Sequence, residues 1–340
     1  MSSILVTGGT GYIGSHTVIE LLNLNFNVII VDNLSNSELT AIDRINKITG
    51  KTPKFYKYDV CNRQELRHIF TDNSEIDTVI HFAAYKAVGE SVEQPLKYYH
   101  NNISGLITLL ECMEEFNVQN LIFSSSCTVY GQPKTLPVDE NTELQPANSP
   151  YGNTKRISED IIRDFINSGS KLRAILLRYF NPVGAHESGL IGELPQGIPN
   201  NLMPYITQTA LGIREKLMVF GGDYTTPDGT AIRDYIHVSD LAIAHIKSID
   251  YLKDKSGGFM DILNVGTGEG YSVLQVINSI NKILEHPLPY TIVGRRAGDI
   301  EKIWADSSKC MNKLNWKPKF SLDDMTSTAY IWEKLLRSGQ

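Results

Sequence analysis

The 340-residue sequence predicts an α/β protein in which a doubly wound parallel sheet is followed by a smaller C-terminal α/β domain. Three observations support this prediction. Short apolar runs alternate with helix-length segments through the first half, a glycine-rich turn follows the first run, and Gly- and Pro-rich loops replace this rhythm after about residue 181. We place the domains at residues 1–180 and 181–340, with some segments of the second half returning to the first domain.

The predicted strands are short apolar runs that end in polar or turn residues. The first, Ile4–Val6, precedes an amphipathic stretch from about Ile13 to Leu24, which gives a strand, a turn and a helix. The further strands are Val28–Val31, Phe55–Tyr58, Thr78–Phe82, Leu121–Phe123 and Leu172–Tyr179. A parallel sheet of this kind binds ligands at the carboxyl ends of its strands. In the second half, Ser239 and Ser272 are predicted to cap helices that run to Leu252 and Leu284.

Composition and charge argue against several classes of protein. The net charge is −6 and no basic run is present, so nucleic acid is not an expected partner. The sequence contains neither a stretch of about 18 apolar residues nor a basic segment leading into an apolar one, so membrane insertion and export are not expected. The four cysteines lie far apart without a C-x-x-C pair, which favours reduced thiols in the cytoplasm over disulfides or a metal site.

The segment TGGTGYIG at residues 7–14 predicts a phosphate-binding turn. Gly9, Gly11 and Gly14 form G-x-G-x-x-G, and Gly8 with the last two forms a wider version of the pattern. Glycines let the backbone approach a pyrophosphate, whose charge the following helix N-terminus stabilises. About 20 residues on, Asp32 ends the second strand, where a carboxylate can bind both ribose hydroxyls and would repel a 2′-phosphate. This favours NAD over NADP in a Rossmann-type fold. A glycine turn that binds no ligand, followed by an aspartate in an ordinary turn, would fit the same residues.

A Tyr-x-x-x-Lys pair opens the helix that follows the fifth predicted strand. Tyr151 and Lys155 lie on one face of a helix that continues to Ile166. A phenol titrates near pH 10, so a role as base near pH 7 requires a shift of about three units, or roughly 4 kcal/mol. The Lys155 ammonium and the positive ring of oxidised nicotinamide both favour phenolate. Without the dinucleotide-binding context, the same spacing fits an amphipathic helix with an exposed lysine.

Three serines, residues 124–126, end the strand that begins at Leu121. A hydroxyl there can bind a substrate oxygen during proton transfer, although serines also satisfy strand ends. No G-x-S-x-G motif is present, so a serine-hydrolase site is not expected.

These motifs, with LRYFNPVGAH at 177–186, PQGIPNNLMPY at 195–205 and RDYIHV at 233–238, resemble those of the UDP-glucose 4-epimerase family of extended short-chain dehydrogenase/reductases. The resemblance runs from about residue 4 to about 335. It implies that Tyr151, aided by Ser126, takes the proton of the sugar 4-hydroxyl as hydride passes from C4 to NAD. The 4-keto sugar then turns over and receives the hydride on its other face, so NAD stays bound as a catalyst.

The resemblance also implies which residues contact each ligand, and it assigns a homodimer formed through helices near 94–115 and 151–166. Lys155 would hold the nicotinamide ribose. The implied NAD contacts beyond the four glycines, Tyr151 and Lys155 are Tyr12, Ile13, Asp32, Asn33, Asn36, Ser37, Asp59, Val60, Phe82, Ala83, Lys86, Asn101, Ser124 and Tyr179. The implied UDP-hexose contacts, besides Lys86, Ser126 and Tyr151, are Asn181, Asn200, Asn201, Leu202, Met218, Phe220, Arg233, Arg296, Asp299 and Ile303.

Several of these assignments also follow from residue chemistry, while others stay open. Arg233 and Arg296 can each bind two diphosphate oxygens, although surface ion pairs would also occupy them. Phe220 fits either a uracil contact or the core. Ile303 stands where some family members carry a large aromatic and others a small residue that admits an N-acetyl group; we expect UDP-glucose and UDP-galactose only. We interpret His237 as structural and Cys127 as a packing residue.

Three other functions share part of this pattern. A 4,6-dehydratase would need an Asp-Glu pair where Cys127 and Thr128 stand. A net oxidoreductase would accumulate reduced cofactor with product. A non-catalytic NAD-binding sensor would keep the glycine turn but have no need of the Tyr-Lys pair.

Overall fold

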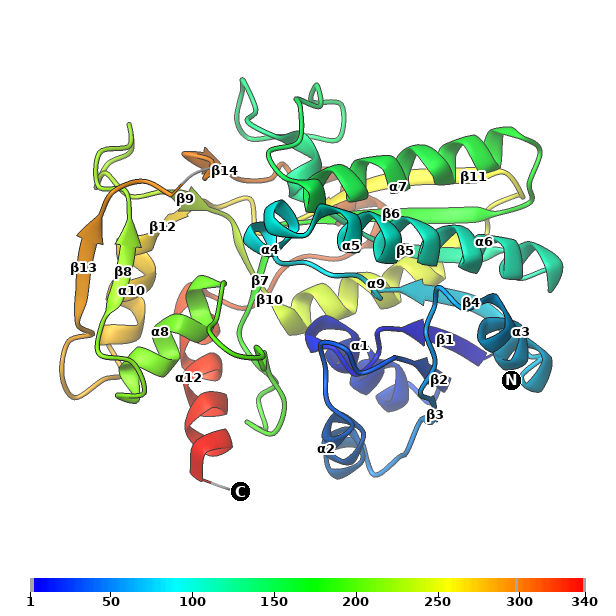
Figure 1. Ribbon diagram of the computed structural model, residues 1–340, viewed down its shortest axis with the longest axis horizontal. Helices are drawn as coiled ribbons and strands as arrows, with labels where there is room; N and C mark the ends of the chain where they lie inside the picture. Colours follow the sequence, from blue (N-terminus) through cyan, green and yellow to red (C-terminus); the bar gives the residue numbers. More distant parts are fainter. Residues whose placement is uncertain (1–2, 297–298, 339–340) are drawn as a thin grey trace.

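The computed structural model describes residues 3–296 and 299–338 and is built on a seven-stranded sheet (Figure 1). Every strand pairing in this sheet is parallel. In spatial order, the strands are β11 (Phe259–Val265), β6 (Arg173–Tyr179), β5 (Asn120–Ser126), β4 (Ile76–His81), β1 (Ser3–Thr7), β2 (Asn27–Val31) and β3 (Lys54–Tyr56). The order reverses direction at β1, as in a doubly wound sheet. The predicted fold class is confirmed.

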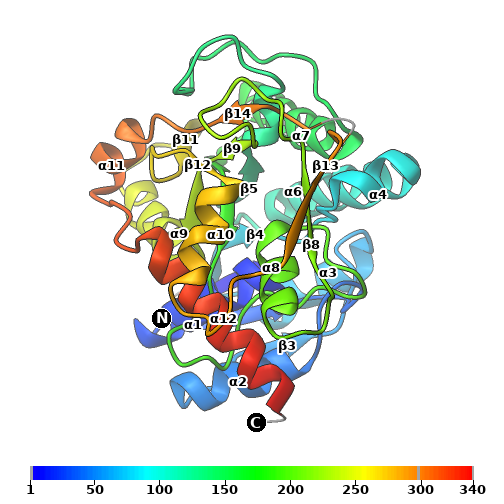
Figure 2. The same cartoon turned by 90° about the vertical axis from the view of Figure 1, so that its left-hand side faces the viewer.

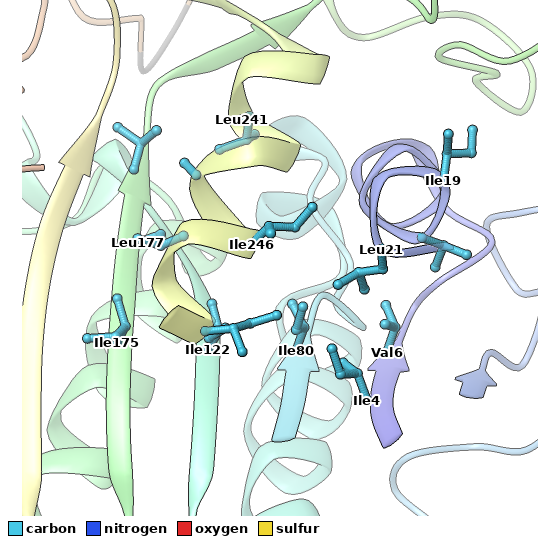
Figure 3. Close-up of a cluster of buried hydrophobic side chains, with 14 of the residues drawn as sticks. Ile4, Val6, Ile19, Leu21, Ile80, Ile122, Ile175, Leu177, Leu241 and Ile246 are labelled. Atoms are coloured by element: carbon cyan, nitrogen blue, oxygen red, sulfur yellow. The ribbon is translucent and has the colours of Figure 1, made fainter. Parts of the chain in front are cut away.

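Helices cover both faces of this sheet because its strands are apolar on both sides. One face packs against α1 (Tyr12–Asn23), α2 (Thr40–Thr49) and α9 (Val238–Leu252). Figure 3 shows this layer, with Ile122 and Leu177 of the strands facing Leu241 and Ile246 of α9. The other face packs against α3 (Arg63–Asp72), α6 (Gly105–Glu115) and α7 (Pro150–Asn167). Three shorter helices, α4 (Val88–Glu93), α5 (Pro95–Tyr99) and η1 (His100–Ser104), lead from β4 to α6.

The second half of the chain forms small sheets and helices beside the large sheet (Figure 2). Its strands are β7 (Asn181–Val183) with β10 (Tyr235–His237), β12 (Tyr271–Ser272) with β9 (Ile232–Arg233) and β14 (Lys302–Ile303), and β13 (Tyr290–Val293) with β8 (Leu217–Phe220). Its helices are α8 (Leu202–Ala210), α10 (Val273–Asn281), α11 (Ser308–Leu314) and α12 (Leu322–Ser338). Because β11 and α9 join the large sheet, the second half returns to it; the exact division at residue 181 stays a prediction.

The two predicted helix caps have different outcomes. Ser272 caps α10 as predicted, in a capping box with Gln275, although α10 ends at Asn281 rather than at Leu284. The prediction that Ser239 caps α9 is wrong. The cap is His237, whose Nδ1 accepts the backbone N–H of Ser239 at 3.1 Å. The histidine ring nitrogen therefore accepts the N–H that the sequence assigned to a serine hydroxyl.

In the part of the chain that the structure describes, residues 3–296 and 299–338, every helix is too short or too polar to span a membrane.

Candidate active site

The glycine turn between β1 and α1 forms a tight backbone cradle. Gly8 has a φ of +69°, and a Cβ there would lie 2.8 Å from the backbone nitrogen of Ala83. A Cβ on Gly14 would lie 2.2 Å from the carbonyl oxygen of Gly8. Helix α1 begins at Tyr12, and no side chain caps it. The N–H groups of its first turn therefore remain available to an anion, so the turn fits a pyrophosphate.

Acidic and hydroxyl groups gather at the carboxyl end of β2. The Asp32 carboxylate is buried and accepts hydrogen bonds from the N–H of Thr10 at 3.2 Å and of Leu34 at 2.9 Å, and from the Ser37 hydroxyl at 3.0 Å. The Asn33 amide donates to Asp59 at 3.1 Å. The structure therefore brings these predicted cofactor contacts together beside the glycine turn.

The remaining cofactor candidates follow neighbouring strands or enter from nearby helices. Phe82 and Ala83 come directly after β4, and Val60 comes after β3. The Asn101 amide, in η1, donates to Asn102 at 3.0 Å. Ser124 is hydrogen-bonded to the hydroxyl of Tyr179 across β5 and β6. Asn36 is exposed, next to Ser37.

Tyr151 and Lys155 lie at the start of α7, against the carboxyl end of β5. Ser149 caps this helix by accepting the N–H of Gly152 at 3.2 Å, and Pro150 occupies its first turn. Lys155 is buried, and its Nζ donates to the carbonyl oxygen of Ser124 at 2.6 Å. The Ser126 hydroxyl accepts hydrogen bonds from the N–H and the hydroxyl of Thr128, at 3.2 and 3.0 Å. The helix cap thus fixes the segment that carries the predicted base.

The pKa values in this cluster reflect burial. Burial raises the pKa of Tyr151 to about 12, and the neighbouring Ser126 hydroxyl offsets only part of the rise. Burial also lowers the pKa of Lys155 to about 7, against the opposing charge of Glu159. In the chain alone, desolvation of the phenol outweighs the effect of its neighbours, so the un-ionised form of Tyr151 is favoured near pH 7. That the Lys155 ammonium and the positive nicotinamide ring together bring Tyr151 toward phenolate stays a prediction.

Two residues that the sequence assigned to supporting roles keep them. Burial raises the pKa of the Cys127 thiol to about 12, so its thiolate is not populated near pH 7. His237 caps α9 and stacks on Phe320, with ring centroids 4.0 Å apart.

Six of the predicted substrate contacts of the second half lie on β8, β9, β14 and the loop before β14. Met218 and Phe220 alternate with buried residues on β8, and Phe220 is 41% exposed, so it is not a core residue. The Arg296 guanidinium lies 5.5 Å from the centroid of the Phe220 ring and pairs with Asp299 at 2.8 Å. The two charged candidates therefore bind each other here.

Arg233 and Ile303 are adjacent across paired strands. The Arg233 guanidinium donates to the carbonyl oxygens of Ile232 and Glu301, at 2.9 and 3.4 Å. Ile303 is buried in a cluster that includes Tyr130 and Phe180. Its side chain is therefore held by neighbours rather than projecting freely.

A carboxylate that the sequence analysis missed connects candidates from both halves. Glu193 accepts hydrogen bonds from Lys86 Nζ at 2.9 Å and from the Asn201 amide at 2.7 Å. Asn200 and Asn201 are exposed just before α8, which begins at Leu202. Nearby, the Tyr12 hydroxyl donates to the carbonyl oxygen of Gly184 at 2.6 Å, and Asn181 donates its N–H to the carbonyl of Asp234 at 3.0 Å. Because Glu193 stands in an irregular loop, no sequence periodicity marks it.

A doubly wound sheet, a glycine cradle and a Tyr-Lys pair at the end of β5 define the class as extended short-chain dehydrogenase/reductase. A family model described as GDP-mannose 4,6 dehydratase matches residues 5–329. A UDP-glucose 4-epimerase of Dictyostelium discoideum is 52% identical over 336 residues, which are 99% of this chain and 97% of that protein.

Solved structures are also similar over the whole chain. A UDP-glucose 4-epimerase of Bifidobacterium longum, in complex with NAD+ and UDP, has 49% identity and a TM-score of 0.95, with both chains covered completely. One from Stenotrophomonas maltophila, with bound NAD and formylated UDP-arabinopyranose, has 45% identity and a TM-score of 0.96, again over both complete chains. The chain belongs to the UDP-glucose 4-epimerase family.

Proposed function

We propose that this protein interconverts UDP-galactose and UDP-glucose by transient oxidation at sugar C4 with tightly bound NAD. The observation that carries the proposal is the position of α7, which holds Tyr151 and Lys155 against the end of β5, on the same sheet edge as the glycine cradle. Relatives at about 50% identity over the full length carry the same activity in their names.

The cofactor assignment rests on the fit of the cradle and of Asp32. The N–H groups at the start of α1 would hold the pyrophosphate, and Asp32 would bind the adenosine ribose. NAD, when bound, supplies a hydride acceptor and donor and a positive ring.

The protein side chains then transfer the proton and orient the sugar and the cofactor. Tyr151 takes the proton of the sugar 4-hydroxyl at its phenol oxygen and later returns it. Ser126 holds the same sugar oxygen, and Lys155 binds the nicotinamide ribose and stabilises the phenolate.

The UDP moiety would bind across β8, β9 and the loop before β14. Phe220 presents an exposed ring for the uracil, and Arg233 and Arg296 offer guanidinium groups for the diphosphate. Binding would exchange the Arg296–Asp299 and Lys86–Glu193 contacts for contacts to substrate. Ile303 is buried in a cluster with Tyr130 and Phe180, which supports the expected restriction to UDP-glucose and UDP-galactose.

A homodimer and a cytoplasmic location complete the proposal. Exposed apolar side chains gather on α4, α5 and α6, where Leu96 is 81% exposed and Val92 is 61% exposed. Helices α4 and α5 pack on α7, so a second copy could cover this face with the helices that the family resemblance implies. All four cysteines are free thiols, which suits a reducing compartment.

The test uses purified protein and UDP-galactose labelled with deuterium at C4, without added cofactor. We expect UDP-glucose to form up to a stable mixture with UDP-galactose, to retain the label at C4, and to appear without NADH absorbance rising in step. NADH that accumulates in proportion to product would indicate a net oxidoreductase. A product that has lost water would indicate a dehydratase, and binding of NAD with no product would indicate a sensor.

A further inference from the structure

A buried ion pair lies directly behind the Tyr-Lys pair. Glu159, on α7, is one helical turn beyond Lys155 and two turns beyond Tyr151. Arg178, on β6, donates from Nε and Nη2 to the two oxygens of the Glu159 carboxylate, at 2.9 and 2.6 Å. Both side chains are almost fully buried. A charge pair of this kind costs desolvation energy, so its presence here calls for a function.

The pair connects the elements that carry the catalytic candidates. The Ser125 hydroxyl donates to Glu159 at 2.5 Å, so the carboxylate contacts β5 between Ser124 and Ser126. Arg178 Nη1 donates to the hydroxyl of Tyr130 at 3.1 Å, and that hydroxyl donates to Asn264 on β11 at 2.6 Å. The Glu159 carboxylate thereby fixes the distance between α7 and the end of β5.

Around the Tyr151–Lys155 pair, positively charged side chains outnumber negatively charged ones. The titratable and charged groups near Tyr151 and Lys155 are His81 on β4, Tyr98 on α5, Cys127 after β5, Glu159 on α7, and Arg178 and Tyr179 on β6. Burial lowers the pKa of His81 to about 3, which keeps it neutral. Two cations, Lys155 and Arg178, therefore share one carboxylate among these groups.

We propose that Glu159 is a positioning residue for the reaction: its carboxylate ties α7 to β5 and β6 and supplies the negative charge that balances the Lys155 ammonium. This inference rests on the proposed epimerase function, because it assumes that Lys155 must be protonated during turnover. A purely structural ion pair would hold the fold together but would leave the titration of Lys155 unaffected.

The test compares the alkaline limb of the pH profile of kcat/KM for UDP-galactose in the purified holoenzyme and three variants. Loss of the carboxylate in Glu159→Gln should move the limb to lower pH by roughly one unit, because Lys155 loses its counter-charge. Loss of the cation in Arg178→Met should move it to higher pH. The opposite directions distinguish an electrostatic role from a general loss of stability, which thermal unfolding reports separately.

The double variant Glu159→Gln/Arg178→Met covers the case in which the single change leaves Arg178 unpaired and the protein unfolded. The alkaline limb of the double variant should lie at lower pH than that of Arg178→Met alone. This difference again reports the effect of the Glu159 carboxylate. An unmoved limb in every folded variant would overturn the inference while leaving the proposed function intact. An inactive wild-type protein would instead overturn the proposed function.

Discussion

The ammonium nitrogen of Lys155 lies 2.6 Å from the backbone carbonyl oxygen of Ser124. This hydrogen bond joins α7 to the carboxyl end of β5, where the predicted ligands would meet. The Lys155 ammonium also lies 5.0 Å from the centroid of the Phe123 ring. Since a buried ammonium with few partners loses its proton easily, its pKa falls to about 7. The hydrogen bonds of the site are therefore formed in the chain alone, while burial disfavours the charged forms of both Lys155 and Tyr151.

The glycine cradle gives a prediction with a matched control. Gly14→Ala places a Cβ 2.2 Å from the carbonyl oxygen of Gly8, so the turn must shift. We expect the purified variant to carry at least tenfold less NAD and to lose about 1–3 kcal/mol of unfolding free energy. In Gly89→Ala, the new Cβ meets no heavy atom within 4 Å, so NAD content should not change. Equal NAD content in both variants would contradict the cradle assignment.

Four buried histidines predict a loss of stability in mild acid. Burial lowers the pKa of His16 and His81 to about 3 and that of His237 and His245 to about 4. The unfolded chain takes up protons at these residues below pH 6.5, whereas the folded chain does not. The free energy of unfolding should therefore fall as pH drops below 6.5, by up to about 1.4 kcal/mol per pH unit for each histidine.

Buried carboxyl groups oppose this trend. Burial raises the pKa of Asp234 to about 6 and also raises the pKa values of Glu20, Glu140 and Asp240, so the folded chain gains protons there first and is stabilised as pH falls. Four histidines outweigh Asp234, whose pKa lies nearest to neutral among these carboxyl groups, and urea unfolding at pH 7.5, 6.5 and 5.5 should show a net decrease. His245→Gln should make the slope shallower. A free energy that stays constant or rises over this range would contradict the assignment of neutral buried histidines.

We predict that substrate choice depends on Ile303. The side chain is buried in a cluster with Tyr130 and Phe180, so we expect kcat/KM for UDP-N-acetylglucosamine to be at least tenfold below that for UDP-glucose. Ile303→Ala should raise the ratio of the two constants, which does not depend on how much protein is folded. Ile277→Ala, in a different buried cluster, should leave the ratio unchanged. Comparable turnover of both sugars by the unmodified protein would refute this restriction.

The proposed dimer predicts an effect of charge on an exposed surface. Leu96→Asp should abolish the dimer at micromolar concentration and leave monomer stability within about 0.5 kcal/mol, since the side chain is 81% exposed. Ile198→Asp, which changes a side chain 70% exposed in a distant loop, is the control. Sedimentation velocity distinguishes the two. A wild-type protein that sediments only as a 38.0 kDa species would exclude the dimer.

The sequence predicted the sheet well because apolar runs and a glycine turn are local signals. Each predicted strand of the first half overlaps an observed one, and the helix that carries Tyr151 and Lys155 begins at Pro150, where the sequence placed its start. The cap of α9 was missed because a histidine ring occupied a position usually taken by a short polar side chain.

The long-range partners in the site could not be predicted from local patterns. Glu193 meets Lys86 and Asn201 only because the chain folds back on itself. Glu159 lies four residues after Lys155, just as Lys155 lies four residues after Tyr151, so its place on the same helix face could be predicted from the sequence. Its partner Arg178 could not, because it lies on a separate strand. Desolvation of Tyr151 likewise depends on tertiary burial, which spacing alone does not report.

The most direct test of the account is the rate at which Tyr151→Phe converts UDP-galactose into UDP-glucose, measured with its NAD content matched to that of the unmodified protein. The change removes one hydroxyl and keeps the ring in place. We predict full NAD content with a rate at least a hundredfold lower, because general-base catalysis contributes about 10²–10⁴-fold. A rate equal to that of the unmodified protein would contradict the assignment of Tyr151 as the base.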